Sequence, residues 1–127
     1  MPTDQHTNSE TPIRIIIGET VLTGRLWNNP TARDLIDQLP LTLAFRDYNR
    51  VEKIGQLPRK LTMNGVPPGD GPFPRDIGYY NPAFVLVFYY DDVANFPGIV
   101  RIGQFDGSMD AIVNQTRDFT AMIELVQ

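Results

Sequence analysis

The chain has 127 residues, of which 42% are hydrophobic and 20% charged, and its formal net charge is −4. This length and composition predict one globular domain over residues 13–127, preceded by a disordered polar tail over residues 1–12. No run approaches the roughly 20 apolar residues of a membrane helix, and no secretory leader is recognisable, so we expect a soluble, cytoplasmic protein without membrane contact.

The sequence is poor in residues that carry metal or covalent chemistry. It has no cysteine, and its one histidine, His6, lies in the polar tail. This excludes sulfur-based zinc sites and thiolate catalysis, and it removes the usual general base from the folded part. The adjacent carboxylates of Asp91 and Asp92 would point to opposite faces of a strand and chelate a cation poorly. We therefore expect no metal and no cofactor and, because the basic residues are scattered, no nucleic-acid partner.

The first third of the chain predicts a hairpin followed by a helix. Alternating apolar residues favour strands over 13–17 and 21–27 with a tight turn between them. Asn29 and Pro30 are typical of a helix start. The apolar stripe from Ala32 to Leu39 predicts an amphipathic helix that ends at Pro40.

The middle of the chain centres on a strongly apolar stretch. Strands are predicted over 41–46 and 57–63, with a polar loop over 47–55 between them and a Pro-rich loop over 66–76 after them. Residues 83–90 contain no charge and are rich in aromatic and β-branched side chains, which predicts a central strand. Phe84, Leu86, Phe88 and Tyr90 would face one side and the equally apolar residues 83, 85, 87 and 89 the other, so both faces must be covered.

The last third predicts a strand over 99–105, a short helix carrying Met109, Ile112 and Val113, and a strand over 118–126. The whole pattern indicates a mainly β fold of about eight strands, in the range that closes into a small barrel, with two short capping helices.

Several short motifs resemble the bacterial and archaeal cyclophilin-like domain family. They are LPLTL at 39–43, Tyr48 followed by Glu52 and Lys53, Leu57-Pro58, DIGYY at 76–80, LVFYYD at 86–91 and Ile102-Gly103. The resemblance covers about residues 13–126 and implies a closed eight-stranded cyclophilin-like β-barrel with a helix at each open end. Arg75 departs from the small residue expected before Asp76, which concerns only the local turn.

The resemblance does not extend to the prolyl isomerases among the true cyclophilins. Those enzymes carry an Arg, a Phe-x-x-Phe-x-x-Gln-Gly-Gly run and a pocket Trp and His. The run is missing from this sequence, Trp27 lies in an early strand and His6 lies in the tail. Isomerase activity is therefore not carried over, since a shared fold alone does not imply a shared function.

The candidate site residues lie around the polar loop and the central strand. Glu52 is the candidate acid or base, with burial raising its pKa, and Tyr79 the second candidate catalytic residue. Candidate ligand-binding residues are Arg46, Tyr48, Arg50, Met63, Tyr80 and Phe88, with Arg46 and Arg50 placed to orient an anionic or carbonyl-bearing ligand. The same residues also fit a solvated loop with one ion pair, tyrosines that anchor a loop, and ordinary core packing.

Two functions remain open from the sequence. The first is a binding module in which an aromatic-edged pocket takes a small apolar molecule or a peptide. The alternative is a biosynthetic enzyme of the cyclase type, which would work by substrate folding and hydrogen bonding without a metal or a nucleophile. The pattern does not fix whether the protein is an enzyme, nor its oligomeric state. Any site is expected beside the Pro-rich loop, between residues 48–53 and 79–80.

Overall fold

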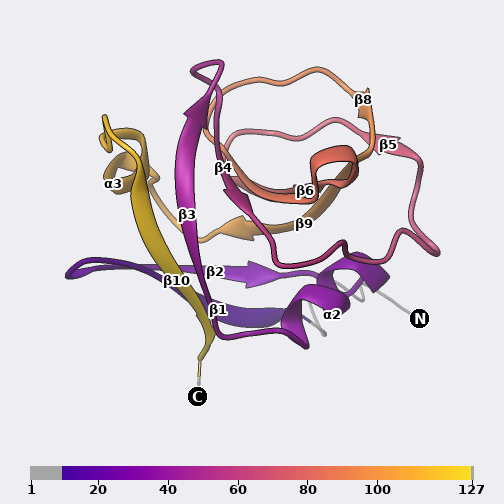
Figure 1. The fold of residues 1–127 in the computed structure, drawn as a ribbon, viewed down its shortest axis with the longest axis horizontal. Coiled ribbons are helices and arrows are strands. Elements are labelled where there is room, and N and C mark those ends of the chain that lie inside the picture. Colours follow the sequence, from indigo (N-terminus) through magenta and orange to yellow (C-terminus); the bar gives the residue numbers. More distant parts are fainter. Residues whose placement is uncertain (1–9, 127) are drawn as a thin grey trace.

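The structure, a computed structural model, describes residues 10–126 and has a closed barrel as its main feature (Figure 1). Eight strands close the barrel in the order β1-β10-β3-β4-β7-β6-β9-β2, with every neighbouring pair antiparallel. The strand bounds are β1 Thr11–Ile17, β2 Thr20–Leu26, β3 Leu41–Tyr48, β4 Glu52–Gln56, β6 Asp76–Tyr80, β7 Val85–Tyr89, β9 Ile99–Phe105 and β10 Phe119–Leu125. The predicted closed eight-stranded barrel is confirmed.

Short helices and a small second sheet complete the fold. Helix α2 spans Pro30–Ile36 and α3 spans Asp110–Val113, and a 3₁₀ turn, η1, covers Asn81–Ala83. The side chain of Asn29 accepts a hydrogen bond from the Ala32 N–H at 2.8 Å, which is the predicted cap. The two-stranded sheet pairs β5, Gly69–Asp70, with β8, Phe96–Pro97. Most of the predicted tail over residues 1–12 lies outside the described residues, and β1 begins at Thr11.

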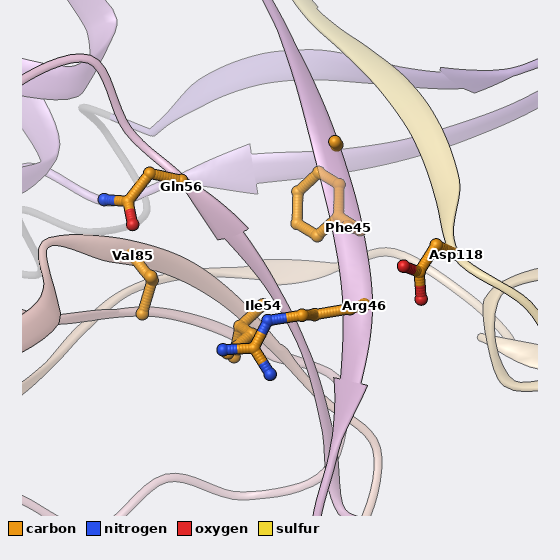
Figure 2. A pocket seen from close by; sticks show the side chains of 7 residues that line it. Phe45, Arg46, Ile54, Gln56, Val85 and Asp118 are labelled. Atoms are coloured by element: carbon orange, nitrogen blue, oxygen red, sulfur yellow. The ribbon is translucent and has the colours of Figure 1, made fainter.

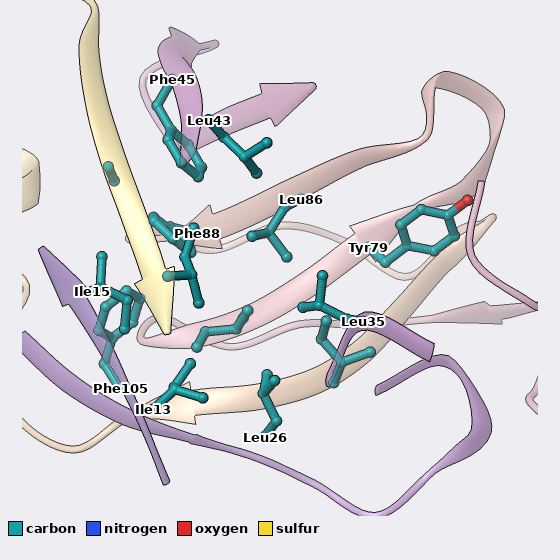
Figure 3. Packing of buried hydrophobic residues seen from close by; sticks show 14 of the residues in the cluster. Ile13, Ile15, Leu26, Leu35, Leu43, Phe45, Tyr79, Leu86, Phe88 and Phe105 are labelled. Atoms are coloured by element: carbon teal, nitrogen blue, oxygen red, sulfur yellow. The ribbon is translucent and has the colours of Figure 1, made fainter. Parts of the chain in front are cut away.

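The barrel interior holds the main hydrophobic core, as Figure 3 shows. Phe45 from β3 stacks on Phe88 from β7 at 4.5 Å between ring centroids, and Phe105 from β9 meets Phe88 edge-on at 5.0 Å. Leu35 of α2 and Ile112 of α3 belong to the same buried core. Side chains on one face of every strand are therefore covered by the opposite wall and the two helices.

The β3–β4 hairpin forms where the sequence predicts a loop. Residues 47–55 were expected to form a loop, but β3 runs to Tyr48 and β4 begins at Glu52. Asn49 and Arg50 have φ of 54° and 59°, and the Val51 N–H donates to the Tyr48 carbonyl at 3.2 Å, so the three-residue connection contains a tight turn whose two central residues are left-handed. Asn-Arg lacks the glycine that usually announces such a turn.

The expected strand over 57–63 is also wrong, because none of the strands falls there. Its apolar alternation has another cause: Leu57 and Leu61 are buried against the barrel core without any strand partner. The Leu61 N–H donates to the Tyr79 hydroxyl at 3.0 Å, and the Thr62 carbonyl accepts from the Thr31 hydroxyl at 2.7 Å. The segment is thus held by side chains rather than by a ladder.

The central strand is shorter than expected and has a neighbour that the pattern missed. Strand β7 begins at Val85 because Pro82 lies in the 3₁₀ turn η1, and Asp76–Tyr80 forms β6 beside it. The two apolar faces of β7 are both covered, as predicted. Leu86 and Phe88 join the barrel core, whereas Val85, Val87 and Tyr89 join a second cluster on the outer face with Ile54 and Ile99.

Two loops cross this outer face beside the second cluster. One is the Pro-rich segment before β6 and the other connects β7 to β9, and they are tied together by the β5–β8 pair. Asp76 is fully buried and anchors the first loop: its carboxylate accepts from the Phe73 N–H at 2.8 Å, from Arg101 at 2.7 Å and from Gln104 at 3.3 Å. The barrel wall therefore has a covered outer surface as well as a filled interior.

Candidate functional site

The outer face of β3, β4, β7, β6 and β9 carries a hollow of about 530 Å³, which we call the outer pocket. Its floor is the barrel wall, with Glu52, Ile54, Tyr80, Val85, Tyr89 and Ile99 among the lining side chains. Its cover is the connection between β7 and β9, which contributes Asp92, Val93, Ala94 and Phe96. This volume lies in the range of sites that hold small organic ligands.

A row of three side chains crosses one end of the floor. Tyr48 of β3 pairs with Glu52 of β4, and Glu52 pairs with Tyr89 of β7. Directly opposed residues of an antiparallel sheet share a face and lie within contact range. Glu52 therefore lies between two tyrosine positions on the neighbouring strands. A second row, Val85, Tyr80 and Ile99, gives the floor an apolar section.

The cover of the outer pocket is positioned by backbone pairing. Gly69 lies against the backbone of Phe96 and Pro97, where an added Cβ would approach the Phe96 carbonyl oxygen to 2.8 Å. The Gly98 N–H donates to the Pro68 carbonyl at 2.8 Å. The Phe96 ring meets the Tyr80 ring at 6.3 Å between centroids, so the cover and the floor meet through aromatic side chains.

Glu52 has an unusual electrostatic setting. Within residues 10–126 its carboxylate makes no hydrogen bond or ion pair. Burial, and secondarily the negative charge of Asp47, raises the pKa of the Glu52 carboxyl from 4.5 to about 7. A carboxyl with such a pKa exchanges a proton readily at neutral pH, which suits it for acid–base chemistry or for binding a cation.

The hydroxyl of Tyr89 also has no hydrogen-bond partner among the described residues. Its ring lies over Gly78, where an added Cβ would approach a ring carbon of Tyr89 to 2.6 Å, so Gly78 makes room for it. Burial, and then the charge of Glu52, raises the pKa of this hydroxyl above its ordinary range. The hydroxyl is therefore a permanent donor and acceptor at neutral pH.

Arg46 separates the outer pocket from a smaller hollow of about 130 Å³, shown in Figure 2. Its guanidinium lies beside Ile54 and has no hydrogen-bond or ion-pair partner within residues 10–126. The smaller hollow also contains Gln56, whose amide donates to the carbonyls of Ala83 and Phe84 at 3.1 Å each. Arg46 is thus the exposed cation that a ligand in either hollow could reach.

The structure brings together four of the eight candidate site residues. Arg46, Tyr48, Glu52 and Tyr80 all line the outer pocket, between the two segments where a site was expected. The site was expected beside the Pro-rich loop. The lining residues of the cover instead come from the connection between β7 and β9.

The other four candidates lie elsewhere. Phe88 and Tyr79 are buried in the barrel core, and Met63 packs against that core from the segment after β4. The Tyr79 hydroxyl accepts from the Leu61 N–H and donates to the Asn81 side chain, both at 3.0 Å. Arg50 lies in the β3–β4 turn and does not line the pocket. The roles predicted for these four stay predictions.

The charged residues of the β3–β4 hairpin that face inward form a network of their own. Lys53 is only 4% exposed, and its ammonium donates to the Gln115 carbonyl at 2.9 Å and pairs with Asp47 at 3.2 Å. The Tyr90 hydroxyl donates to the same carboxylate. This network ties the hairpin to the segment after α3, whereas Glu52, one residue earlier in the strand, faces the pocket.

Sequence reasoning missed Tyr89, Phe96 and Ile99 as lining residues. Tyr89 was predictable, because the alternation already assigned it to the face opposite Phe88. Phe96 lies in a connection without a periodic pattern, and Ile99 faces the pocket only because β9 pairs with β6, a strand that the pattern did not separate from its neighbour.

Among residues 10–126 no cluster of acidic, histidine or cysteine side chains could hold a metal ion. No helix in this part of the chain is both long and apolar enough to cross a membrane.

Comparison with known proteins supports the fold. The solution structure of the hypothetical protein AF2241 from Archaeoglobus fulgidus is similar, with a TM-score of 0.70, 15% sequence identity, and coverage of 92% of this chain and 95% of that one. At this identity the similarity concerns the fold alone. No curated protein matches the sequence significantly. The sequence model of the cyclophilin-like family matches residues 15–124. The chain therefore belongs to the cyclophilin-like family.

Proposed function

We propose that the protein binds a small apolar molecule, or an apolar side chain of a peptide, in the outer pocket. The observation that carries this proposal is the combination of a hollow of about 530 Å³ with apolar and aromatic walls and a few polar groups that have no partner of their own. Ligand sites in proteins commonly combine mostly apolar walls with few polar groups that orient the ligand.

Several polar groups of the pocket lining have no hydrogen-bond partner within residues 10–126. Among them are the Glu52 carboxyl and the Tyr89 hydroxyl, from paired positions on β4 and β7, and the Arg46 guanidinium, which lines both hollows. Each makes no hydrogen bond within residues 10–126. A bound ligand therefore gains these groups without breaking an existing interaction, which favours binding.

The alternative is an enzyme of the cyclase type that uses the same pocket. The pKa of about 7 of Glu52 favours it, because an acid or base is most effective when its pKa is near the working pH. In that function the apolar walls fold a flexible substrate and Glu52 moves a proton. Mass spectrometry of a ligand before and after incubation with the protein separates the two functions, since a binding module returns its ligand unchanged.

The test of binding is an NMR titration of the isotope-labelled protein. Suitable probes are indole and cyclohexanol for small apolar ligands, and succinyl-Ala-Ala-Pro-Phe-anilide for peptides. We expect saturable shifts in the backbone amides of the floor and cover, centred on Tyr80, Phe96 and Ile99. Shifts confined to another surface, or none with any probe, would overturn the proposal.

A matched pair of variants locates the site. Ala94→Trp places a large side chain in the cover of the pocket, whereas Val21→Trp places the same side chain on the exposed part of β2. We expect Ala94→Trp to weaken binding at least about tenfold, because the indole occupies ligand volume, and Val21→Trp to bind as the wild type does. Equal affinity of the two variants contradicts a site in this pocket.

A further inference from the structure

The charge of the outer pocket is unbalanced in a way that indicates a class of ligand. Glu52 carries a half-buried carboxyl with no ion-pair partner within residues 10–126, and Asp92 adds a second carboxylate to the lining. Partly buried charges in proteins are normally paired, because removing a charge from water is costly unless an opposite charge compensates. The missing partner of Glu52 is therefore expected from a ligand.

Four aromatic side chains line the same pocket as this carboxyl. Tyr48 and Tyr89 flank it on the neighbouring strands, while Tyr80 and Phe96 line the same pocket and meet at 6.3 Å. The faces of aromatic rings attract cations, most strongly in sites that are partly shielded from water. A carboxylate among aromatic rings is the arrangement that recognises substituted ammonium groups.

We propose that the ligand of the outer pocket is an organic cation, an ammonium or quaternary ammonium group on an apolar body, with Glu52 as its counter-ion. This inference rests on the proposed function and specifies its ligand class. The apolar section formed by Val85, Ile99 and Val93 accommodates the body, and the row Tyr48, Glu52 and Tyr89 receives the cationic head.

The positive charge of Arg46, which also lines the pocket, would favour an anionic ligand instead of a cationic one. It pairs with Ile54, one row along the sheet from Glu52, and it is exposed. Within residues 10–126 no ion pair joins the Arg46 guanidinium to the Glu52 carboxyl, so this carboxyl lacks a direct counter-ion in the protein. An anionic head next to Glu52 would meet like charge, whereas a cation there would meet an opposite charge.

The first experiment compares three probes that share a benzyl group and differ in charge: benzyltrimethylammonium, benzyl alcohol and phenylacetate. Affinities are measured by NMR titration of the full chain at about pH 8, where the Glu52 carboxyl is ionised. We expect benzyltrimethylammonium to bind roughly tenfold more tightly than benzyl alcohol, and phenylacetate to bind most weakly.

Substitutions then assign the preference to its residue. Glu52→Gln keeps the shape and removes the charge, so we expect the affinity for benzyltrimethylammonium to fall roughly tenfold and that for benzyl alcohol to stay unchanged. Glu19→Gln removes an exposed carboxylate from the β1–β2 turn and serves as the matched control. Arg46→Gln removes a positive charge from the pocket lining, so it is expected to increase the affinity for the cation.

The outcomes separate this inference from the proposed function. If benzyl alcohol binds as tightly as the cation, or if Glu52→Gln retains the preference, the cation inference fails and the binding function stands. If phenylacetate binds most tightly and loses affinity in Arg46→Gln, the ligand is an anion and the inference is wrong. If none of the three shifts the pocket amides, both proposals fail.

The pH dependence gives a second readout. The affinity for the quaternary cation, which does not titrate, is expected to rise between about pH 6 and pH 8 as Glu52 loses its proton. Asp47, on the adjacent strand, titrates below this range and Tyr89 above it. The other titratable groups that line the pocket are Tyr48, Tyr80, Asp92 and Arg46. A flat profile, or the same rise in Glu52→Gln, contradicts the role of Glu52.

Discussion

Glu52 destabilises the empty protein when it is charged, because its carboxyl is half-buried without a partner. Its pKa in the folded state, about 7, lies above its ordinary value of 4.5, so the folded protein binds this proton more firmly than the unfolded chain does. Stability therefore falls as the pH rises from about 4.5 to about 7, and the full penalty is present above that range.

Replacement of Glu52 by glutamine tests this penalty. At about pH 8 we expect Glu52→Gln to unfold at a higher urea concentration than the wild type. Its free energy of unfolding is expected to be larger by about 1–2 kcal/mol, a value that allows for solvent screening of a half-exposed group. At about pH 4, where both side chains are neutral, the two proteins are expected to be equally stable. Equal stability at both pH values would show that the charge is solvated. Glu19→Gln, in an exposed turn, is the control.

The hydroxyl of Tyr79 belongs to the fold rather than to the outer pocket. It bonds the Leu61 N–H and the Asn81 side chain, so Tyr79→Phe leaves a buried N–H without an acceptor and is expected to cost about 1–3 kcal/mol in urea unfolding. Tyr80→Phe is the matched control: the Tyr80 hydroxyl makes no hydrogen bond within residues 10–126, so its loss is expected to change stability little. If Tyr79→Phe keeps full stability and abolishes ligand binding, Tyr79 acts at the site.

At the scale of elements, β7 links the two sides of the barrel wall. Its inward residue Phe88 stacks on Phe45 and meets Phe105 edge-on, and it is 1% exposed. Phe88→Ala is expected to cost about 3–5 kcal/mol, the range for emptying an aromatic core position. Phe96→Ala, at a ring 52% exposed, is expected to cost less than about 1 kcal/mol. A loss below about 1 kcal/mol for Phe88→Ala in urea unfolding would place its ring in a space that already admits water.

Elements with a strong apolar period could be predicted from the sequence, and elements defined by their partners could not. The β1–β2 hairpin, α2, β9 and β10 have clear periods and appear within a few residues of their expected bounds. Strand β4 begins with two charged residues, Glu52 and Lys53, which in the sequence alone are typical of a loop. In the structure Glu52 lines the outer pocket on one face of the strand, and Lys53 pairs with Asp47 on the other. The segment over 57–63 alternates because it covers the barrel core, not because it pairs.

The candidate site was predictable only in part for the same reason. Arg46, Tyr48, Glu52 and Tyr80 were found because polar and aromatic residues gather near strong strands. The cover of the pocket was not, because Phe96 reaches it through the β5–β8 pair, a contact between two loops that no local pattern predicts.

At the scale of the whole molecule, the cyclophilin-like barrel supplies a frame whose outer face can carry different chemistry. The interior is filled by aromatic and aliphatic side chains, so ligands are expected on the outer face. Family membership fixes the barrel, but function depends on the residues placed on it. In the site proposed for this protein those residues are the Glu52 carboxyl and the tyrosines of the outer pocket.

Prolyl isomerisation is therefore expected to be absent, or at least about a hundredfold slower than in true cyclophilins, which corresponds to about 2.7 kcal/mol of transition-state stabilisation. Trp27, the sole tryptophan, does not line either hollow and has Arg101 stacked on its ring at 5.1 Å, so it supplies no aromatic wall to the site. A protease-coupled assay with succinyl-Ala-Ala-Pro-Phe-p-nitroanilide measures kcat/KM, with a true cyclophilin as the positive control. A kcat/KM within tenfold of that of the control would contradict this expectation. If the Arg46→Gln variant then lost the activity, the isomerase chemistry would lie on β3.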